Sequence, residues 1–258
     1  MTIIDQMHTH RSIRKYKPDS VPEELLQKIL EAGIRASSSG NMQSYSIIVT
    51  ADQELREQLY IAHREQAMVL QAPLLLTFCA DFNRMRKWLR ISNAPDNFDN
   101  FVSFVIAAID AILVSQNVAL AAESEGLGIC YLGSTFSNCD QVGRILALPK
   151  NVVPVVGFTL GYPDEQPALR DRLPLDGLVH YDTYRDYNDE RIAKIYEQRE
   201  IFGWERYMSS PRLRELIIRS QAENLAQVYT TVKYPRSRYE EISNKVINYL
   251  KEQGFPAD

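Results

Sequence analysis

Apolar positions along the chain recur with two different spacings, and these spacings predict its helices and strands. Leu26, Ile29 and Leu30 recur three or four residues apart, as the apolar side of an amphipathic helix does. This spacing, or the length of an apolar run, predicts helices over residues 21–36, 53–70, 101–122 and 139–150. Apolar runs of strand length predict strands over residues 46–52, 72–82, 129–133 and 152–163.

The longest apolar run, FVSFVIAAIDAILVSQNVALAA at 101–122, has the length of a membrane span. Asp110, Gln116 and Asn117 interrupt it, which favours a buried helix of a protein core. Strands and helices alternate on both sides of this run. The order indicates a layered α/β or α+β fold with a central sheet.

The pattern changes near residue 165. Residues 165–184 are polar and interrupted by prolines, which indicates an extended arm, and residues 185–253 are mostly helical and charged. We find no internal repeat and no clean linker. The prediction is therefore one domain over 1–258, with a core over about 1–164, an arm over about 165–186 and a helical C-terminal excursion over about 187–258.

Composition narrows the possible functions. The chain has 258 residues, 45% of them hydrophobic and 24% charged, which is ordinary for a soluble globular protein. Its net charge of −4 argues against a nucleic-acid-binding protein. The three cysteines are odd in number and form no CxxC pair, so we expect reduced thiols in a cytoplasmic protein without a thiolate metal site. No apolar leader is visible at the N-terminus, and no membrane association is predicted.

The usual catalytic motifs are missing from the sequence. The four histidines form no HExxH motif, no metal-ligand spacing and no visible catalytic triad. A Gly-rich Rossmann motif and a P-loop are also absent. If the protein is an enzyme, a bound cofactor is expected to carry its chemistry, with no catalytic side chain and no metal.

Three polar segments could bind such a cofactor, and each has a simpler interpretation. HRSIR at 10–14 could hold a phosphate through its guanidinium groups, or it could be a solvated basic turn. SSSGNMQSY at 37–45 could contact a planar heterocycle through its amides, or merely connect a helix to a strand. GLGICYLGS at 126–134 could let the backbone approach a ligand, or end a helix in a tight turn.

Together, in this order, the segments closely resemble the nitroreductase superfamily. The resemblance is to its larger, oxygen-insensitive NAD(P)H-dependent flavin and nitro-compound reductases, and it spans about the first 185 residues. The matching segments are HRSIRKY (10–16), ASSSGNMQSYSII (36–48), FCADFNR (78–84), VALAAESEGLGICYLGS (118–134), LPKNVVPVVGFTLGYP (148–163) and RDRLPLDGLVHYDTY (170–184).

The resemblance implies an α+β fold with a central, mostly antiparallel sheet flanked by helices. It further implies an obligate homodimer that binds FMN at the subunit interface, with the C-terminal arm extending over the partner. The family's FMN-binding positions carry over to His10, Arg11, Ser12, Arg14, Ser38, Ser39, Gln43, Gln66, Tyr131, Leu132, Gly133, Ser134, Arg170 and Arg172. Many relatives have a second glycine where this chain has Ser134.

The roles implied for these residues divide between the two ends of the flavin. Arg11, Ser12 and Arg14 would hold the phosphate, with His10 alongside and with Arg170 and Arg172 as a second basic pair. Backbone N–H groups of Gly133 or Ser134 would lie near flavin N5 and O4, and Gln66 would contact the polar edge of the ring. Ser38, Ser39 and Gln43 would border the flavin from the opposite subunit.

The expected activity is ping-pong, two-electron reduction of nitro compounds, quinones or free flavin, with NADPH or NADH as hydride donor. Lys233, Arg236 and Arg238 are the nearest match to the family's loop for the NADPH 2′-phosphate, with FGWERY at 202–207 as a competitor and a cationic surface helix as the simpler interpretation. The alternative function is a flavin-binding sensor or carrier of the same fold. Loop 84–100 and an insertion over about 188–232 are expected to shape the pocket.

Overall fold

A computed structural model describes residues 2–256 of the chain. These residues form two compact units. The first unit comprises the chain up to Ala168 together with the stretch from Ile242, and the second comprises Leu169–Glu241. The assignment of the whole chain to one domain stays a prediction.

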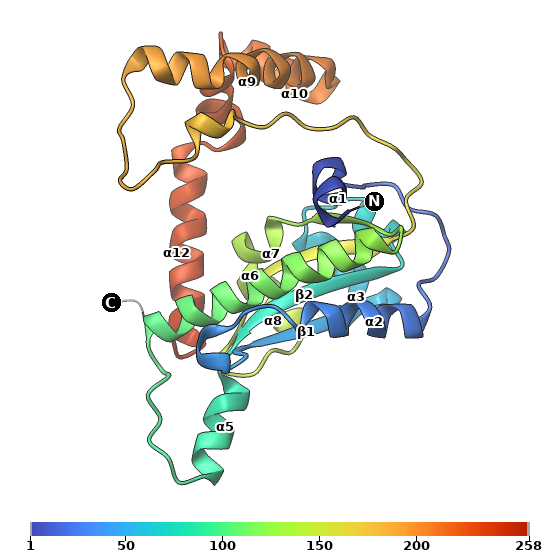
Figure 1. Ribbon diagram of the computed structural model, residues 1–258, viewed down its shortest axis with the longest axis vertical. Coiled ribbons are helices and arrows are strands. Elements are labelled where there is room, and N and C mark those ends of the chain that lie inside the picture. The colour runs from blue at the N-terminus through green and yellow to red at the C-terminus, as the bar shows by residue number, and fades with distance from the viewer. Residues whose placement is uncertain (1, 257–258) are drawn as a thin grey trace. The chain divides into compact units, whose positions relative to one another are not determined.

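The first unit contains the sheet and the helices around it. Its elements, which Figure 1 labels in part, are α1 (Ile3–Thr9), α2 (Glu23–Gly33), β1 (Tyr45–Thr50), α3 (Gln53–Ala62), α4 (Met68–Gln71), β2 (Leu74–Asp81), α5 (Asn83–Ile91), α6 (Phe101–Ser124), β3 (Gly128–Tyr131), α7 (Ser134–Ser137), α8 (Cys139–Ile145) and β4 (Val152–Gly161). A short 3₁₀ turn covers Ser39–Asn41.

The four strands form one open sheet in the order β1-β2-β4-β3, and every neighbouring pair is antiparallel. Ile47 of β1 and Val156 of β4 both pair with Phe78 of β2. The register of β2 and β4 shifts between Phe78 and Cys79. The predicted α+β fold with a mostly antiparallel central sheet is confirmed.

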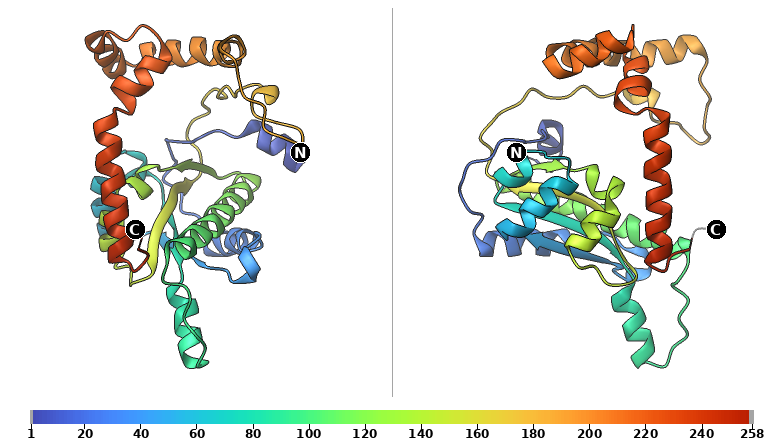
Figure 2. Two further views of the ribbon diagram at one scale, coloured as in Figure 1. Left: turned by 90° about the vertical axis from the view of Figure 1, so that its left-hand side faces the viewer. Right: turned by 180° about the vertical axis from the view of Figure 1, so that it is seen from behind.

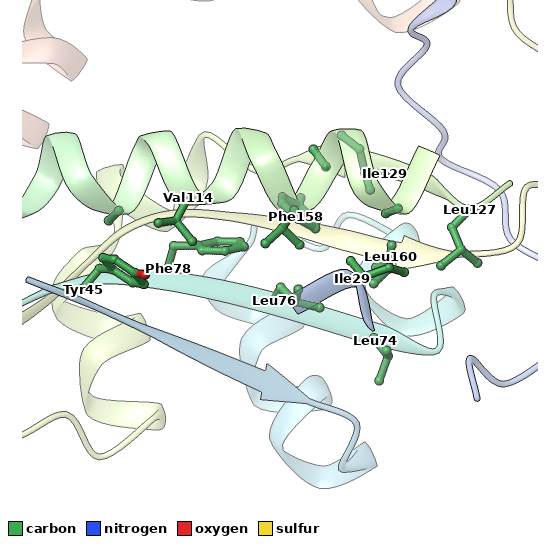
Figure 3. Packing of buried hydrophobic residues seen from close by; sticks show 14 residues of the cluster. Ile29, Tyr45, Leu74, Leu76, Phe78, Val114, Leu127, Ile129, Phe158 and Leu160 are labelled. Carbon is green, nitrogen blue, oxygen red and sulfur yellow. The ribbon is translucent and has the colours of Figure 1, made fainter. Parts of the chain in front are cut away.

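Helices cover both faces of the sheet. On one face α6 and α2 pack on Leu76, Phe78 and Phe158, and Figure 3 shows Phe78 and Phe158 beside Val114 between the helix and the strands. The rings of Phe78 and Phe158 are 5.2 Å apart, within the range of favourable aromatic pairs. Side chains of α3, α4 and α8 form a second cluster with Leu75. Seen from behind, these cyan and lime helices lie over the other face (Figure 2).

Helix α6 has two apolar sides. One side is buried and repeats every three or four residues through Phe104, Ala107, Ala111 and Val114, which is the packing predicted for a core helix. The helix also meets the length and hydropathy expected of a membrane span, but 44% of its most apolar window is buried in the protein. Its opposite side carries an exposed apolar stripe made of Phe101, Val102, Val105, Ile109, Ile112 and Leu113.

Two predicted segments differ from the structure. The single helix expected over 53–70 is two helices, because Arg64 and Glu65 have positive φ angles of 59° and 54° and end the helical path after His63. Within the loop expected over 84–100, residues up to Ile91 are helical and belong to α5. Met85, Trp88 and Leu89 recur three and four residues apart, so the apolar pattern does mark α5 as amphipathic, although none of its residues is buried.

The second unit is mainly helical. Its elements are a 3₁₀ turn (Leu175–Gly177), α9 (Asp189–Ser209), α10 (Pro211–Ser220), α11 (Leu225–Val228), a five-residue π turn (Tyr229–Lys233) and the first residues of α12 (Arg236–Glu252). Tyr207, Ile217, Leu225 and Val228 form its buried cluster. No regular element lies between Gly177 and Asp189, and the assignment of residues 165–186 to an arm stays a prediction. Arg199 forms an ion pair with Asp171 at 2.8 Å.

Candidate functional site

The basic segment at 10–14 is held against the start of β3. Ser12 forms a parallel β-bridge with Ile129, and the N–H of Ile13 donates to the Ile129 carbonyl at 2.8 Å. The Ile13 side chain is buried over Gly128, where an added Cβ would lie 2.5 Å from Ile13 Cγ1. Glycine is therefore required at 128 for this close approach. Because neighbouring side chains of an extended chain point to opposite sides, Ser12 and Arg14 lie opposite the buried Ile13 side chain. Arg14 is exposed, whereas Ser12 is half-buried beside the buried Cys130 thiol.

The guanidinium groups of the two arginines in this segment contact neutral groups. Arg11 donates from Nε to the Pro167 carbonyl and from Nη1 to the Thr9 carbonyl, both at 2.8 Å. Arg14 is exposed and makes one long contact, 3.4 Å, to the Ser12 carbonyl. Within residues 2–256 neither guanidinium forms an ion pair with a carboxylate. Both therefore keep a positive charge that an anion could neutralise.

Two carboxylates near this segment were not identified from the sequence. Glu165 accepts hydrogen bonds from the backbone N–H groups of Arg14 and Lys15, and Glu123 lies 2.6 Å from His10 Nδ1. His10, Arg11, Glu123 and Glu165 line part of a cavity of about 340 Å³. Ser12 and Arg14 do not line this cavity, so an anion that they hold would lie outside it.

The loop that carries Ser38, Ser39 and Gln43 is fastened to α6 by Asp110. The Asp110 carboxylate is fully buried and accepts from the Ser39 N–H at 2.9 Å and from the Ser44 hydroxyl at 2.9 Å. A third bond comes from the Ser44 N–H at 3.3 Å. From the sequence, Asp110 counted only as an interruption of an apolar run. Its role is to satisfy the backbone of a loop that has no strand or helix partner.

Gln43 lies at the exposed side of this loop. Its N–H donates to Ser38 Oγ at 3.3 Å, and its φ angle of 52° is in the left-handed region. Gln43 lines a hollow of about 500 Å³ together with Arg84 and Trp88. Arg84 also donates to the Gln43 carbonyl, so α5 helps to hold the loop.

The segment after β3 exposes backbone donors. Gly133 is exposed, and a Cβ added to it would have no atom within 4 Å. In the part of the chain that the structure describes, neither the Gly133 nor the Ser134 N–H donates a hydrogen bond. Tyr131 and Leu132 precede them, with the Tyr131 hydroxyl 3.1 Å from Ser115 Oγ and the Leu132 N–H on the Gly157 carbonyl at 2.8 Å. Two unpartnered backbone donors thus follow the end of the strand, one on the exposed Gly133 and one on the buried Ser134.

Gln66 and an unpredicted histidine meet Ser134. His63 Nδ1 lies 2.9 Å from Ser134 Oγ, and Gln66 Nε2 lies 3.4 Å from the same oxygen. Gln66 Nε2 also donates to the His63 carbonyl at 2.9 Å. His63 is fully buried, and burial lowers the pKa of its ring to about 4. His63 could not be identified from the sequence, since it belongs to no motif and its partner is 71 residues away.

The structure thus brings several of the predicted residues together within the first unit. His10 to Arg14 lie at the start of β3, Tyr131 to Ser134 follow its end, and Gln66 contacts Ser134. Within residues 2–256, no three His, Cys, Asp or Glu side chains are close enough to hold a metal ion.

The remaining predicted residues belong to the second unit. Arg172 Nη1 donates to the Asp171 carbonyl at 3.0 Å, and Arg170 lies two residues before it. Lys233 Nζ lies 5.4 Å from the centre of the Tyr207 ring. Arg236 pairs with Glu240 at 2.7 Å on α12, and Arg238 is exposed on the same helix. Their proposed roles toward ligands stay predictions.

Comparison with known proteins gives consistent matches. Residues 7–162 match the sequence model of the nitroreductase family. The NADPH-flavin oxidoreductase of Vibrio harveyi is 37% identical over 196 residues, covering 76% of this chain and 79% of that protein. The FMN reductase (NAD(P)H) of Bacillus subtilis is 31% identical over 258 residues, covering 99% of this chain and 98% of that protein.

The fold matches over the whole length as well. The crystal structure of nitroreductase A from Vibrio parahaemolyticus superposes with a TM-score of 0.82 at 32% identity, and the match covers 100% of both chains. The helical second unit, which the family model does not reach, therefore has a counterpart in a solved structure.

The buried His63 predicts an acid-sensitive fold. Its pKa is about 4 in the folded chain and near 6.5 when unfolded, so between these values the unfolded state binds the additional proton. The His63 contribution to stability is present above pH 6.5 and is lost as the pH falls toward 4. We expect it to remove about 2 kcal/mol of unfolding free energy between pH 7 and pH 5. Urea unfolding of the wild type and of His63→Asn at both pH values measures this difference. Equal losses in the two proteins would contradict the assignment.

Proposed function

The chain belongs to the nitroreductase family, as its motifs predicted, and we propose that it is an FMN-dependent oxidoreductase that uses NADPH or NADH to reduce nitro compounds, quinones or free flavin. The observation that carries the proposal is the distribution of free donors along one short strand, β3. Cationic Arg11 and Arg14 are held with Ser12 at its start, and the free N–H groups of Gly133 and Ser134 follow its end.

We propose that the start of β3 binds the phosphate of FMN. Arginine forks and a serine hydroxyl suit phosphate oxygens, and the charges of Arg11 and Arg14 have no carboxylate partner among the described residues. His10 would lie alongside, where its contact with Glu123 fixes the ring. Arg170 and Arg172 are proposed as the second basic pair because RDRLP matches the family at that place.

We propose that the end of β3 borders the flavin ring. The N–H groups of Gly133 and Ser134 can donate to its acceptor edge near N5 and O4, and the exposed Gly133, which has no side chain, lets a ligand approach. Tyr131 and Leu132 would lie beside the ring, and Gln66 would contact its polar edge. Ser38, Ser39 and Gln43 are proposed to border the ring of the partner's flavin, on a loop that Asp110 holds in place.

The protein's part in catalysis is binding, orientation and electrostatics. When bound, FMN supplies the centre that takes up and gives back a hydride, so the chain needs no acid–base pair of its own. Backbone donors that are already fixed stabilise negative charge at the acceptor edge without reorganising during the reaction. In the proposed ping-pong cycle the nicotinamide and a small-molecule acceptor occupy the same place in turn. The protein must therefore hold the nicotinamide and the acceptor in the same position against the flavin ring.

Lys233, Arg236 and Arg238 are proposed to bind the 2′-phosphate of NADPH. Lys233 lies over Tyr207, and Arg236 is exposed on the first turn of α12. Glu240 neutralises Arg236 at 2.7 Å, so a phosphate would have to displace that carboxylate. The pair is strongly exposed, and such surface pairs are weak enough for this exchange.

We also propose that the protein is a homodimer, because one copy leaves an apolar surface uncovered. The exposed stripe on α6 is a continuous apolar surface on one side of a rigid helix, and such surfaces mark interaction sites. A second copy of the chain would cover it and would bring the partner's loop 38–43 to the flavin. A cytoplasmic location is proposed as well, because Cys79, Cys130 and Cys139 are buried free thiols.

The proposed function predicts a visible spectrum and its bleaching. The purified protein, alone or after soaking in FMN and desalting, is expected to show flavin absorbance. Anaerobic NADPH or NADH should bleach it, and menadione or a nitrofuran should restore it. A colourless protein after soaking would overturn the proposal. Flavin that is bound but not bleached by either nicotinamide would favour the sensor or carrier function instead.

Arg14 is predicted to bind the phosphate rather than the ring. Arg14→Ala should weaken FMN binding about 10-fold or more, because a charge-assisted hydrogen bond is worth about 1.5–3 kcal/mol. Lys15→Ala removes the neighbouring exposed cation and is the matched control. It should change the dissociation constant for FMN less than about 3-fold. Riboflavin, which lacks the phosphate, should bind both variants like the wild type. Flavin fluorescence titration of the apoprotein gives these constants, and equal losses for FMN and riboflavin in Arg14→Ala would contradict the assignment.

The apolar stripe of α6 is predicted to be the dimer interface. Ile109→Glu should shift the protein to a monomer in sedimentation velocity, because a charge in the centre of an apolar interface is left without a partner. Ile61→Glu places the same charge on an exposed isoleucine of α3 and serves as the control. A dimer that survives Ile109→Glu at micromolar concentration would show that copies associate through another surface.

A further inference from the structure

Three polar side chains meet at the end of β3, next to the free backbone donors. His63 comes from the end of α3, Gln66 from the break before α4, and Ser134 from the start of α7. His63 Nδ1 and Gln66 Nε2 both lie within hydrogen-bond distance of Ser134 Oγ, at 2.9 and 3.4 Å. Ser134 is 5% exposed and His63 is 0% exposed. The proposed flavin contacts do not use this histidine.

The hydrogen-bond roles can be assigned from the protons available. Gln66 Nε2 can only donate, so Ser134 Oγ accepts from it. His63 Nε2 is buried and has no partner among the described residues. A buried N–H without an acceptor is rarer in proteins than an unsatisfied acceptor, so the proton belongs on Nδ1. His63 therefore donates to Ser134 Oγ as well.

This assignment leaves the hydroxyl proton of Ser134 unused. The oxygen accepts from His63 and Gln66, and within residues 2–256 the hydroxyl donates to no acceptor. The ring stays neutral at physiological pH, because burial lowers the pKa of His63 to about 4. It therefore carries a single proton, on Nδ1, and no charge. With both lone pairs of Oγ engaged, the free O–H has one remaining direction. The unpartnered N–H of the same residue lies beside it.

We propose that the Ser134 hydroxyl is a further hydrogen-bond donor to the acceptor edge of the flavin, and that His63 is the positioning residue that turns it outward. The proposal rests on the proposed FMN-dependent function and deepens it. A glycine at 134 could offer only its backbone N–H, whereas the serine adds a second donor on the same residue. Since reduction places negative charge on the flavin's acceptor edge, this donor favours the reduced over the oxidised cofactor.

The midpoint potential of bound FMN tests the proposal independently of turnover. Ser134→Ala should lower the affinity for reduced FMN relative to oxidised FMN about 10-fold, which is a potential about 30 mV lower for two electrons. Ser137→Ala is the control on the same short helix, because its hydroxyl accepts from Arg64 instead, and its potential should equal that of the wild type. Ser134→Gly should behave like Ser134→Ala.

Variants of His63 separate positioning from packing. An asparagine amide can donate to Ser134 Oγ from nearly the position of Nδ1, so His63→Asn should keep the wild-type potential. His63→Leu removes the donor and should lower the potential as Ser134→Ala does, and the double variant His63→Leu/Ser134→Ala should show no additional shift. If His63→Leu does not fold, the proposal is tested by two variants alone: the potential should be lowered in Ser134→Ala and unchanged in His63→Asn. A wild type without flavin would refute the proposed function, whereas a flavin-bound Ser134→Ala with an unchanged potential would refute only the role of the hydroxyl.

Discussion

The rest of the structure depends on how α6 is used on both of its sides. A helix of 24 residues that is apolar all round cannot be left in water on its own, and the sheet covers only one side of it. Phe78 and Phe158 pack against that side and fix the helix across the strands. The other side remains a stripe of large apolar residues. The same element thus builds the core and presents the surface that we assign to a second copy of the chain.

Asp110 shows how a polar loop is attached to this apolar helix. Burying a carboxylate is unfavourable unless hydrogen bonds replace its water, and here three donors from residues 39 and 44 do so. The loop in turn gains fixed partners for backbone groups that no strand satisfies. Its left-handed residues Gly40, Asn41 and Gln43 are then held in one conformation. A loop so fixed can present side chains to a ligand with little loss of entropy.

The features that could be predicted from the sequence are those whose interacting residues are close together along the chain. The strands were predictable because apolar runs report burial locally, and the candidate site segments were nominated because their motifs resemble a family. The break at Arg64 and Glu65 was missed, since positive φ angles at these residue types leave no mark in the apolar pattern. Asp110, Glu165 and His63 were missed as well. Their partners lie at least 66 residues away, and no periodicity reports such pairs.

The contact between His63 and Ser134 leaves a buried nitrogen of His63 without a partner, which lowers stability. This loss of stability suggests that the histidine serves a purpose other than packing. A buried nitrogen without a partner costs about 1–3 kcal/mol, which an apolar side chain at 63 would avoid. Packing alone therefore does not account for a histidine there. Two fixed donors on one serine oxygen leave the hydroxyl a single orientation, whereas a serine without them would rotate freely. A local cost that fixes the direction of one donor, at the strand end proposed to border the flavin, is what preorganisation requires.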